Sequence, residues 1–107
     1  MTIYPPPQLT IDKPEKYVYL FGRELMPSSI PFIIGGITID ITAFDEQFTI
    51  QKALIVIDED LKYRGISPPY QWQWNEKTWG IKTICVKAYD TSGNSAEKDI
   101  KILIFNI

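Results

Sequence analysis

The residues of this 107-residue chain that are best placed for chemistry are two aspartates that end alternating apolar runs. Asp45 follows one run and Asp90 follows another, with Asn94 close behind it. Carboxylate and amide oxygens are ligands of Ca²⁺, which takes about six to eight of them, so Asp45 and Asp90 are candidate calcium ligands. The more ordinary interpretation is that Asp90 accepts backbone N–H bonds within an Asp-x-x-Gly-Asn turn. The lack of dense D-x-D-x-D spacing favours the turn.

Other acidic and hydroxyl side chains lack the partners that catalysis requires. The chain contains no histidine, which removes the usual general base at neutral pH and the commonest metal ligand. Asp58, Glu59 and Asp60 form an acidic cluster, and paired carboxylates about 5–9 Å apart can hydrolyse glycosides in a cleft, but a solvated turn is the simpler interpretation. The serines have no base to activate them. The sequence therefore predicts a protein that is not an enzyme and needs no cofactor.

Aromatic side chains supply a second candidate site. Tyr70, Trp72 and Trp74 alternate with glutamines, which places them on one face of a strand, and Trp79 follows five residues after Trp74. Flat aromatic rings complement the apolar faces of sugar rings, so Trp72, Trp74 and Trp79 are candidates for carbohydrate binding. Burial in the core is the interpretation that we favour, because these side chains offer the largest apolar area that a small domain can bury.

The composition excludes several kinds of partner. Eleven Lys and Arg against thirteen Asp and Glu give a net charge of −2, and the basic residues are scattered, so nucleic acid is not expected as a partner. No apolar run approaches the roughly 20 residues that a membrane helix needs, so we expect no membrane insertion. Cys85, the only cysteine, cannot form an internal disulfide. The first residues lack the basic and apolar regions of a signal peptide, and we expect the chain to be a segment of a longer protein.

The spacing of apolar residues predicts an all-β protein. Period-2 alternation recurs between turn signals about every 8–12 residues, and no helical spacing is present, which predicts an antiparallel sandwich of seven to eight strands. The expected strands cover residues 17–21, 37–43, 48–58, 61–65, 70–74, a run after Gly80 and residues 96–105, with an irregular stretch through Pro27 and Pro31. Gly93 and Asn94 adopt positive φ readily and predict a tight hairpin before the last strand.

The chain also divides into a lead-in and a domain. Residues 1–16 contain Pro5-Pro6-Pro7 and Pro14 and predict a stiff lead-in or linker. The domain itself is expected from residue 17 to 107. Within the lead-in, residues 8–12 could add an edge strand.

Several segments resemble a family of prokaryotic immunoglobulin-like domains that occur as repeats in secreted and surface proteins. The resemblance covers about residues 37–105, and its most specific part is the end, Ala-Tyr-Asp-x-x-Gly-Asn. The segments that carry it, in order, are Ile39-Asp40-Ile41-Thr42-Ala43-Phe44-Asp45, Ile55-Val56-Ile57-Asp58, Pro68-Pro69-Tyr70-Gln71-Trp72-Gln73-Trp74 and the stretch from Gly80 to Asp90, closing on Gly93-Asn94. Glu46-Gln47-Phe48 stands where the family commonly has a glycine, which leaves the shape of this loop open.

The resemblance implies an immunoglobulin-like β-sandwich similar to fibronectin type III domains. It implies a non-catalytic structural or interaction module of a larger secreted or cell-surface prokaryotic protein. Its partners would be neighbouring domains of the same chain, another protein or a second copy of this chain. A carbohydrate-binding accessory domain that uses exposed tryptophans is the alternative. In this topology the strands before Asp45 and Asp90 run the same way, so the two carboxylates would lie at one pole.

Alternation also predicts the outer face of one sheet. If Ile55, Ile84 and Ile102 point into the core, the residues beside them point outward. The outward apolar residues come from strands that are neighbours in this topology: Leu54, Val56, Cys85, Leu103 and Phe105. We expect these residues to form an apolar strip, which marks an interface when it is exposed. The interpretation that we favour is that residues 1–30 fold back and cover the strip; a neighbouring domain or a second copy could contact it instead, or it could remain exposed.

Overall fold

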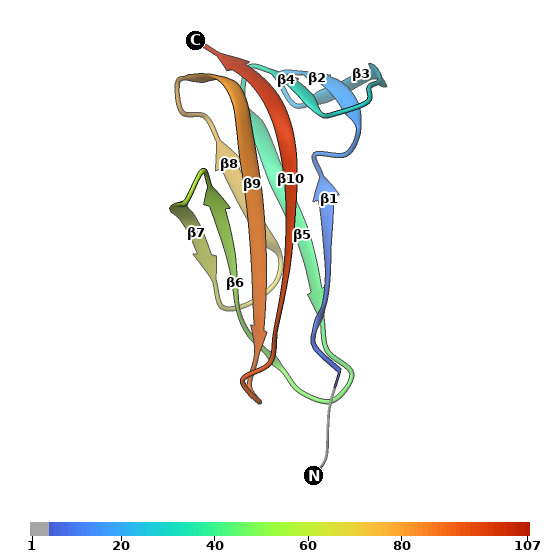
Figure 1. Cartoon of the computed structure of the whole chain (residues 1–107), viewed down its shortest axis with the longest axis vertical. Coiled ribbons are helices and arrows are strands. Elements are labelled where there is room, and N and C mark those ends of the chain that lie inside the picture. Colours follow the sequence, from blue (N-terminus) through green and yellow to red (C-terminus); the bar gives the residue numbers. More distant parts are fainter. Residues whose placement is uncertain (1–4) are drawn as a thin grey trace.

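Ten β-strands form two sheets that pack face to face in the computed structural model, which describes residues 5–107 (Figure 1). In chain order the strands are β1 (Gln8–Lys13), β2 (Tyr17–Leu20), β3 (Arg23–Pro27), β4 (Phe32–Ile34), β5 (Ile37–Phe44), β6 (Ile50–Ile57), β7 (Asp60–Gly65), β8 (Tyr70–Trp74), β9 (Thr78–Asp90) and β10 (Ser95–Asn106). The smaller sheet has the order β1-β5-β8, and the larger has the order β3-β2-β4-β10-β9-β6-β7. The described residues contain no helix, so the predicted all-β immunoglobulin-like sandwich is confirmed.

The core lies between the two sheets and follows the alternation of the sequence. On β5, Ile37 and Ile39 are buried while Thr38 between them faces outward. On β9, Ile84 and Val86 are fully buried against this layer. Side chains on one strand face alternate in and out with a period of two. A single apolar face per strand is therefore enough to hold the two sheets together.

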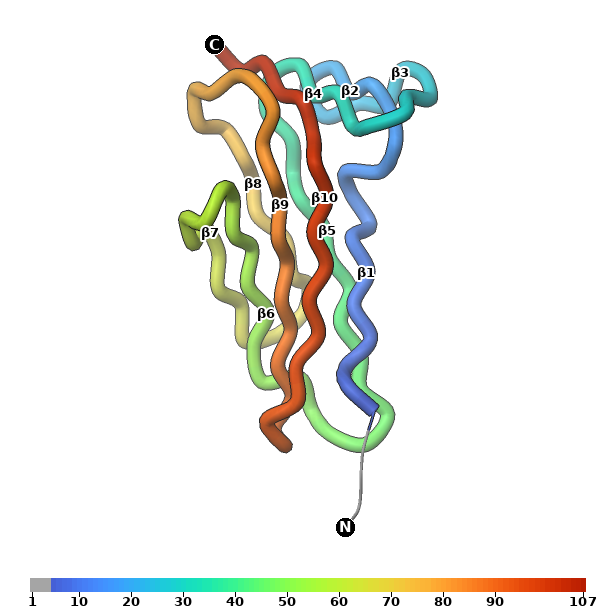
Figure 2. The backbone as a smooth tube through the Cα atoms, viewed as in Figure 1, coloured from blue at the N-terminus to red at the C-terminus, as the bar shows by residue number. Residues whose placement is uncertain are grey.

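The longest element is the hairpin of β9 and β10, which runs the length of the molecule (Figure 2). Its register pairs Thr78 with Asn106 at one end and Tyr89 with Ser95 at the other. Gly93 takes a φ of 96° in the turn, a conformation that glycine adopts at little cost. The predicted hairpin is confirmed, and its turn lies at the lower pole in Figure 1, opposite the C-terminus.

The stretch through Pro27 and Pro31 differs from its prediction as irregular chain. It forms β3 and β4, which raises the strand number from the expected seven or eight to ten. β4 pairs in parallel with both β10 and β2, so the larger sheet is mixed rather than wholly antiparallel. β4 has only three residues and β3 is exposed along its whole length. Neither strand therefore shows the alternation from which strands are read.

The predicted lead-in also differs from the structure. Residues 8–13 form β1, which pairs with β5, and Leu9 is buried in the core. Pro14 is fully buried as well. The sandwich therefore begins before residue 17, as the possible edge strand suggested. The first four residues of the predicted lead-in lie outside the described residues.

Residues 17–34 do not fold over the outer face of the larger sheet. β4 pairs edge to edge with β10, and β2 and β3 continue the same sheet beyond β4. The expectation that the first 30 residues cover the predicted strip is therefore wrong for the described residues. They widen the sheet instead, because backbone pairing at the free edge of β10 satisfies its hydrogen-bonding groups.

Candidate functional site

Two rows of apolar side chains cross one end of the outer face of the seven-stranded sheet. Residues paired across neighbouring strands point to the same face. The first row is Val18, Phe32, Leu103 and Ile81, and the second row is Leu20, Ile34, Phe105 and Trp79, on β2, β4, β10 and β9 respectively. We call these eight residues the apolar end.

Three side chains of the apolar end are widely exposed to solvent. Trp79 is 68% exposed, Ile81 60% and Phe105 40%. The rings of Phe32 and Phe105 lie 5.9 Å apart between centroids, so the aromatic groups form one continuous surface. The two rows lie at the C-terminal end of β10, at the top of Figure 1. Contiguous exposed apolar surface of this kind marks an interaction site in soluble proteins.

The other half of the same face is polar. Thr83, Cys85 and Lys87 of β9 lie opposite Lys101, Asp99 and Glu97 of β10, and we call these six residues the polar end. Lys87 Nζ lies 3.8 Å from Glu97 Oε2, an exposed ion pair. A hollow of about 740 Å³ lies here between β6, β7, β9 and β10. Most of the side chains around the hollow are charged, so this half of the outer face favours contact with solvent.

Cys85 carries the only thiol of the chain, and its surroundings lower its reactivity. Its Sγ donates a hydrogen bond of 3.3 Å to Glu97 Oε1. Partial burial, this hydrogen bond and the negative charge of Glu97 together raise the pKa of Cys85 to about 11. Because the thiolate is the nucleophile, the structure gives Cys85 no catalytic activation.

The five residues of the predicted strip lie on the outer face, but in two groups. Leu103 and Phe105 belong to the apolar end, whereas Leu54, Val56 and Cys85 lie half-buried among charged residues of the other half. Sequence reasoning named Trp79 only as a candidate for carbohydrate binding, and it missed the other five members of the apolar end: Val18, Leu20, Phe32, Ile34 and Ile81. The sequence carries no signal for Phe32 and Ile34, because Ile33 between them is also apolar and only the pairing of β4 with β10 shows which of the three point outward.

The three tryptophans do not share one surface. Trp74 is 1% exposed in the core, and Trp72 is half-buried and stacks on it with ring centroids 6.0 Å apart. Tyr70 is buried beside them. Trp79 lies on the outer face of the other sheet. The favoured interpretation as core side chains therefore holds for Tyr70 and Trp74, and Trp79 is the one tryptophan with a widely exposed ring.

The acidic cluster is a turn, as the simpler interpretation held. Asp58 and Glu59 connect β6 to β7 and take φ values of 46° and 73°, as in two-residue hairpin turns. Asp58 Oδ1 accepts a 2.8 Å hydrogen bond from Thr83 N, and Asp58 Oδ2 lies 3.7 Å from Lys82 Nζ. Both carboxylate oxygens of Asp58 thus have partners, which identifies a structural role.

Asp90 and Asp45 also hold turns, but only with one oxygen each. Asp90 Oδ1 accepts hydrogen bonds from Ser92 N (2.9 Å), Ser92 Oγ (2.6 Å) and Asn94 N (2.9 Å). Asp45 Oδ1 accepts hydrogen bonds from the backbone N–H groups of Gln47 and Phe48, both at 2.9 Å. This bonding defines the loop whose shape the sequence left open. The Oδ2 atoms of both aspartates are buried and have no hydrogen-bond partner.

The ionisation of Asp90 reflects these contacts. Burial acts to raise its pKa, but hydrogen bonds from the Ser92 hydroxyl, the Asp45 carboxyl group and the backbone N–H groups of Asn94 and Ser92 outweigh burial, and the pKa of Asp90 is lowered. The Asp45 carboxyl group therefore lies within hydrogen-bonding reach of Asp90. The two carboxylates do meet at one pole, as the topology predicted.

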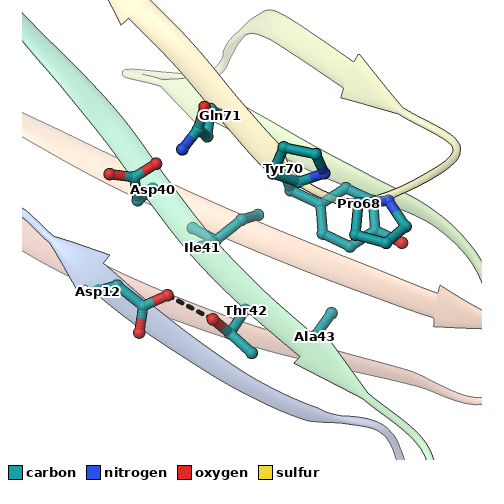
Figure 3. A pocket seen from close by; sticks show the side chains of 9 residues that line it. Asp12, Asp40, Ile41, Thr42, Ala43, Pro68, Tyr70 and Gln71 are labelled. Carbon is teal, nitrogen blue, oxygen red and sulfur yellow. Dashed lines mark hydrogen bonds between the residues drawn. The ribbon is translucent and has the colours of Figure 1, made fainter.

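A hollow of about 460 Å³ lies on the smaller sheet beside Pro68 (Figure 3). Figure 3 shows Asp12 and Asp40 projecting from neighbouring strands, with a hydrogen bond from Thr42 Oγ1 to Asp12 Oδ2. Sequence analysis did not single out either carboxylate, because they meet only through the pairing of β1 with β5. Ile41 and Tyr70, which also line the hollow, belong to the core. We assign no ligand to it.

Residues 5–107 contain neither a cluster of metal-ligand side chains nor a membrane-spanning helix. No group of three or more His, Cys, Asp or Glu side chains lies close enough together to hold a metal ion. No helix that could span a membrane is found in this part of the chain.

Comparison with known proteins identifies the fold. No family model and no curated protein matches the chain. Among solved structures, the fibronectin(III)-like modules of Clostridium thermocellum CbhA match with a TM-score of 0.69 and 19% identity, covering 99% of this chain and 48% of theirs. The chain thus has a fibronectin type III-like sandwich fold, as the resemblance to immunoglobulin-like domains implied.

Two more solved structures share this fold. The endo-β-1,4-mannanase of Thermotoga petrophila matches with a TM-score of 0.69 and 11% identity, covering 94% of this chain and 20% of that one. An engineered protein matches with a TM-score of 0.60 and 8% identity, covering 92% of this chain and 20% of that one. The chain therefore spans about half or one fifth of the length of the proteins that it matches.

Proposed function

We propose that this chain is a non-catalytic structural module of a larger secreted or cell-surface prokaryotic protein, and that its apolar end packs against a neighbouring domain of the same chain. The apolar end is the observation that carries the proposal. Eight apolar residues from four strands form one surface, and three of them, Trp79, Ile81 and Phe105, are at least 40% exposed. Surfaces of this kind are covered by protein in the working assembly.

The solved structures support a modular setting. The matched CbhA chain contains fibronectin(III)-like modules, and this chain covers 48% of it. The match to the mannanase covers 20% of that enzyme's chain, so the shared fold is one part of a longer protein there. The absence of histidine fits a role without catalysis.

The test compares two lysine substitutions, each made in the full-length parent protein and in the isolated chain. Ile81→Lys places a charge in the apolar end, whereas Thr83→Lys places the same charge on the same face of β9, in the polar end. In the full-length parent protein, Ile81→Lys should lower the melting temperature and loosen the docking of the two domains, as measured by small-angle X-ray scattering. Thr83→Lys should leave both unchanged. In the isolated chain both variants should melt as the wild type does.

Other results would redirect or remove the proposal. If the isolated chain self-associates in sedimentation experiments and Ile81→Lys abolishes this, a second copy covers the apolar end instead. If Ile81→Lys changes neither the parent protein nor self-association, the apolar end is not an interface. Loss of binding to a glycan in Trp79→Ala would point to the carbohydrate-binding alternative.

A further inference from the structure

The carboxylates of Asp45 and Asp90 each leave one buried oxygen without a donor. Asp90 is 1% exposed, and its Oδ2 atom has no hydrogen-bond partner. The Oδ2 atom of Asp45 is buried and unpartnered in the same way. Buried polar atoms are almost always hydrogen-bonded in folded proteins. Two such oxygens in neighbouring carboxyl groups require either a proton shared between them or a bound cation.

The backbone fixes the two carboxylates together. Thr91 N donates a 3.0 Å hydrogen bond to Thr49 O, and Ile50 pairs with Asp90 across β6 and β9. The connection from β5 to β6, which Asp45 organises, is thereby tied to the β9–β10 turn. Both segments lie at the lower pole in Figures 1 and 2. The two unpartnered oxygens belong to one site.

Backbone donors hold both carboxylates in place. The Oδ1 atoms of Asp45 and Asp90 accept four hydrogen bonds from backbone N–H groups in total. In the described part of the chain, the lysines that form ion pairs contact Glu76, Asp58 and Glu97, not Asp45 or Asp90. The nearby Lys52 places its Nζ 4.8 Å from the centroid of the Tyr89 ring. Within residues 5–107, the two carboxylates therefore have no basic side chain as an ion-pair partner.

We propose that Asp45 and Asp90 bind Ca²⁺ between their Oδ2 atoms, with water completing the coordination shell. Ca²⁺ prefers carboxylate oxygens and tolerates irregular geometry. Asp45 is partly exposed and borders a hollow of about 390 Å³, from which a hydrated ion could approach its carboxylate. With two protein carboxylates, the dissociation constant should fall in the range of about 10⁻⁴–10⁻³ M found in extracellular modules. This site is independent of the proposed docking surface.

Calcium titration of the chain, stripped of metal with EDTA, tests the site. At a tenfold excess over the dissociation constant, Ca²⁺ should raise the melting temperature by roughly 5 °C or more. In ¹⁵N–¹H NMR spectra, the largest shifts should come from the amides of Gln47, Phe48, Ser92 and Asn94, which face the two carboxylates. Mg²⁺ should act more weakly, because it demands octahedral geometry and gives up its waters reluctantly.

Matched variants locate the response. Asp90→Asn and Asp45→Asn keep an oxygen to accept the turn hydrogen bonds while removing the charge, and either change should abolish the calcium-induced shift. Glu46→Gln removes a charge from the exposed neighbour of Asp45 and should leave the shift intact. Circular dichroism of each variant verifies its fold. A response that persists in Asp45→Asn and Asp90→Asn would overturn the assignment of the site.

A shared proton is the competing explanation of the two oxygens. In that case Ca²⁺ would leave the melting temperature and the amide shifts of the wild type unchanged up to tens of millimolar, which would overturn the proposal. Asp45→Asn would then be as stable as the wild type, because its amide can donate to Asp90 in place of the proton. If Ca²⁺ binds, the wild type should exceed this variant in stability only when calcium is present.

Discussion

The apolar end and the polar end of the outer face share the strands β9 and β10, yet they differ in chemistry. From Trp79 to Ile81 the outward residues are apolar, and from Thr83 to Lys87 they are polar or sulfur-bearing. The partners on β10 change at the same level, from Phe105 and Leu103 to charged residues. On the inner face, Ile102 and Ile104 beside the apolar end and Ile84 and Val86 beside the polar end are all fully buried. Packing of the sandwich therefore does not require this change. This difference supports the proposal that a neighbouring domain packs against the apolar end, while the polar end faces water.

The largest expected effect separates the inner from the outer face of β9. Ile84→Ala should lower the free energy of unfolding by about 2–5 kcal/mol, because it creates a cavity in the core. Ile81→Ala, three residues earlier, should change it by no more than about 0.5 kcal/mol in the isolated chain, because Ile81 is 60% exposed. Urea denaturation measures both. Equal losses in the two variants would mean that the apolar end is already covered within the chain.

A smaller effect concerns the thiol of the polar end. Because the pKa of Cys85 is about 11 instead of 9.0, its thiolate fraction at pH 8 should be about 100-fold lower than in the unfolded chain. Reaction with a disulfide reagent should slow accordingly, and Glu97→Gln should speed it by removing a negative charge. A rate equal to that in urea would contradict the hydrogen bond between Cys85 and Glu97.

The same shift gives a pH dependence with a definite sign. Cys85 binds its proton more tightly in the folded state, so this contribution to stability is complete below pH 9. It is lost as the pH rises through about 11. Cys85→Ser should remove this contribution and flatten the alkaline limb of a stability curve.

The smallest expected effect is on the ion pair of the polar end. Lys87 and Glu97 are 35% and 57% exposed in their side chains, and such pairs contribute about 1 kcal/mol or less. Lys87→Ala should therefore change the free energy of unfolding by less than that amount, and added salt should diminish the difference. A larger loss, insensitive to salt, would show that the polar end is shielded from water.

The fold was predictable because its cause is local. Alternation of Ile37, Ile39 and Ile41, and again of Ile84, Val86 and Ala88, fixes which side of each strand is buried. Alternation did not predict the strands of residues 23–34, because β3 is exposed throughout and β4 is too short to show a period. These residues form strands because β4 pairs with the free edge of β10, and that edge is available only once the larger sheet has assembled.

The candidate sites divide in the same way. Asp45 and Asp90 were found in the sequence because each follows an apolar run, and strand direction places both at one pole. Their unpartnered oxygens were not predictable, since these depend on which atoms the two turns occupy. Two of the eight residues of the apolar end, Leu103 and Phe105, were placed on this face from the sequence. Phe32 and Ile34 were not, because they pair with these two residues across about 70 residues of sequence.

The sequence by itself determined an all-β sandwich, its inner face, the final hairpin and the outward direction of Leu54, Val56, Cys85, Leu103 and Phe105. These follow from the period of two along each strand. The tertiary structure decided that β2, β3 and β4 widen the larger sheet and that Trp79 joins Phe105 on a common surface. Pairing between distant strands depends on which edges remain free after the core has formed, and no single segment of the chain carries that information.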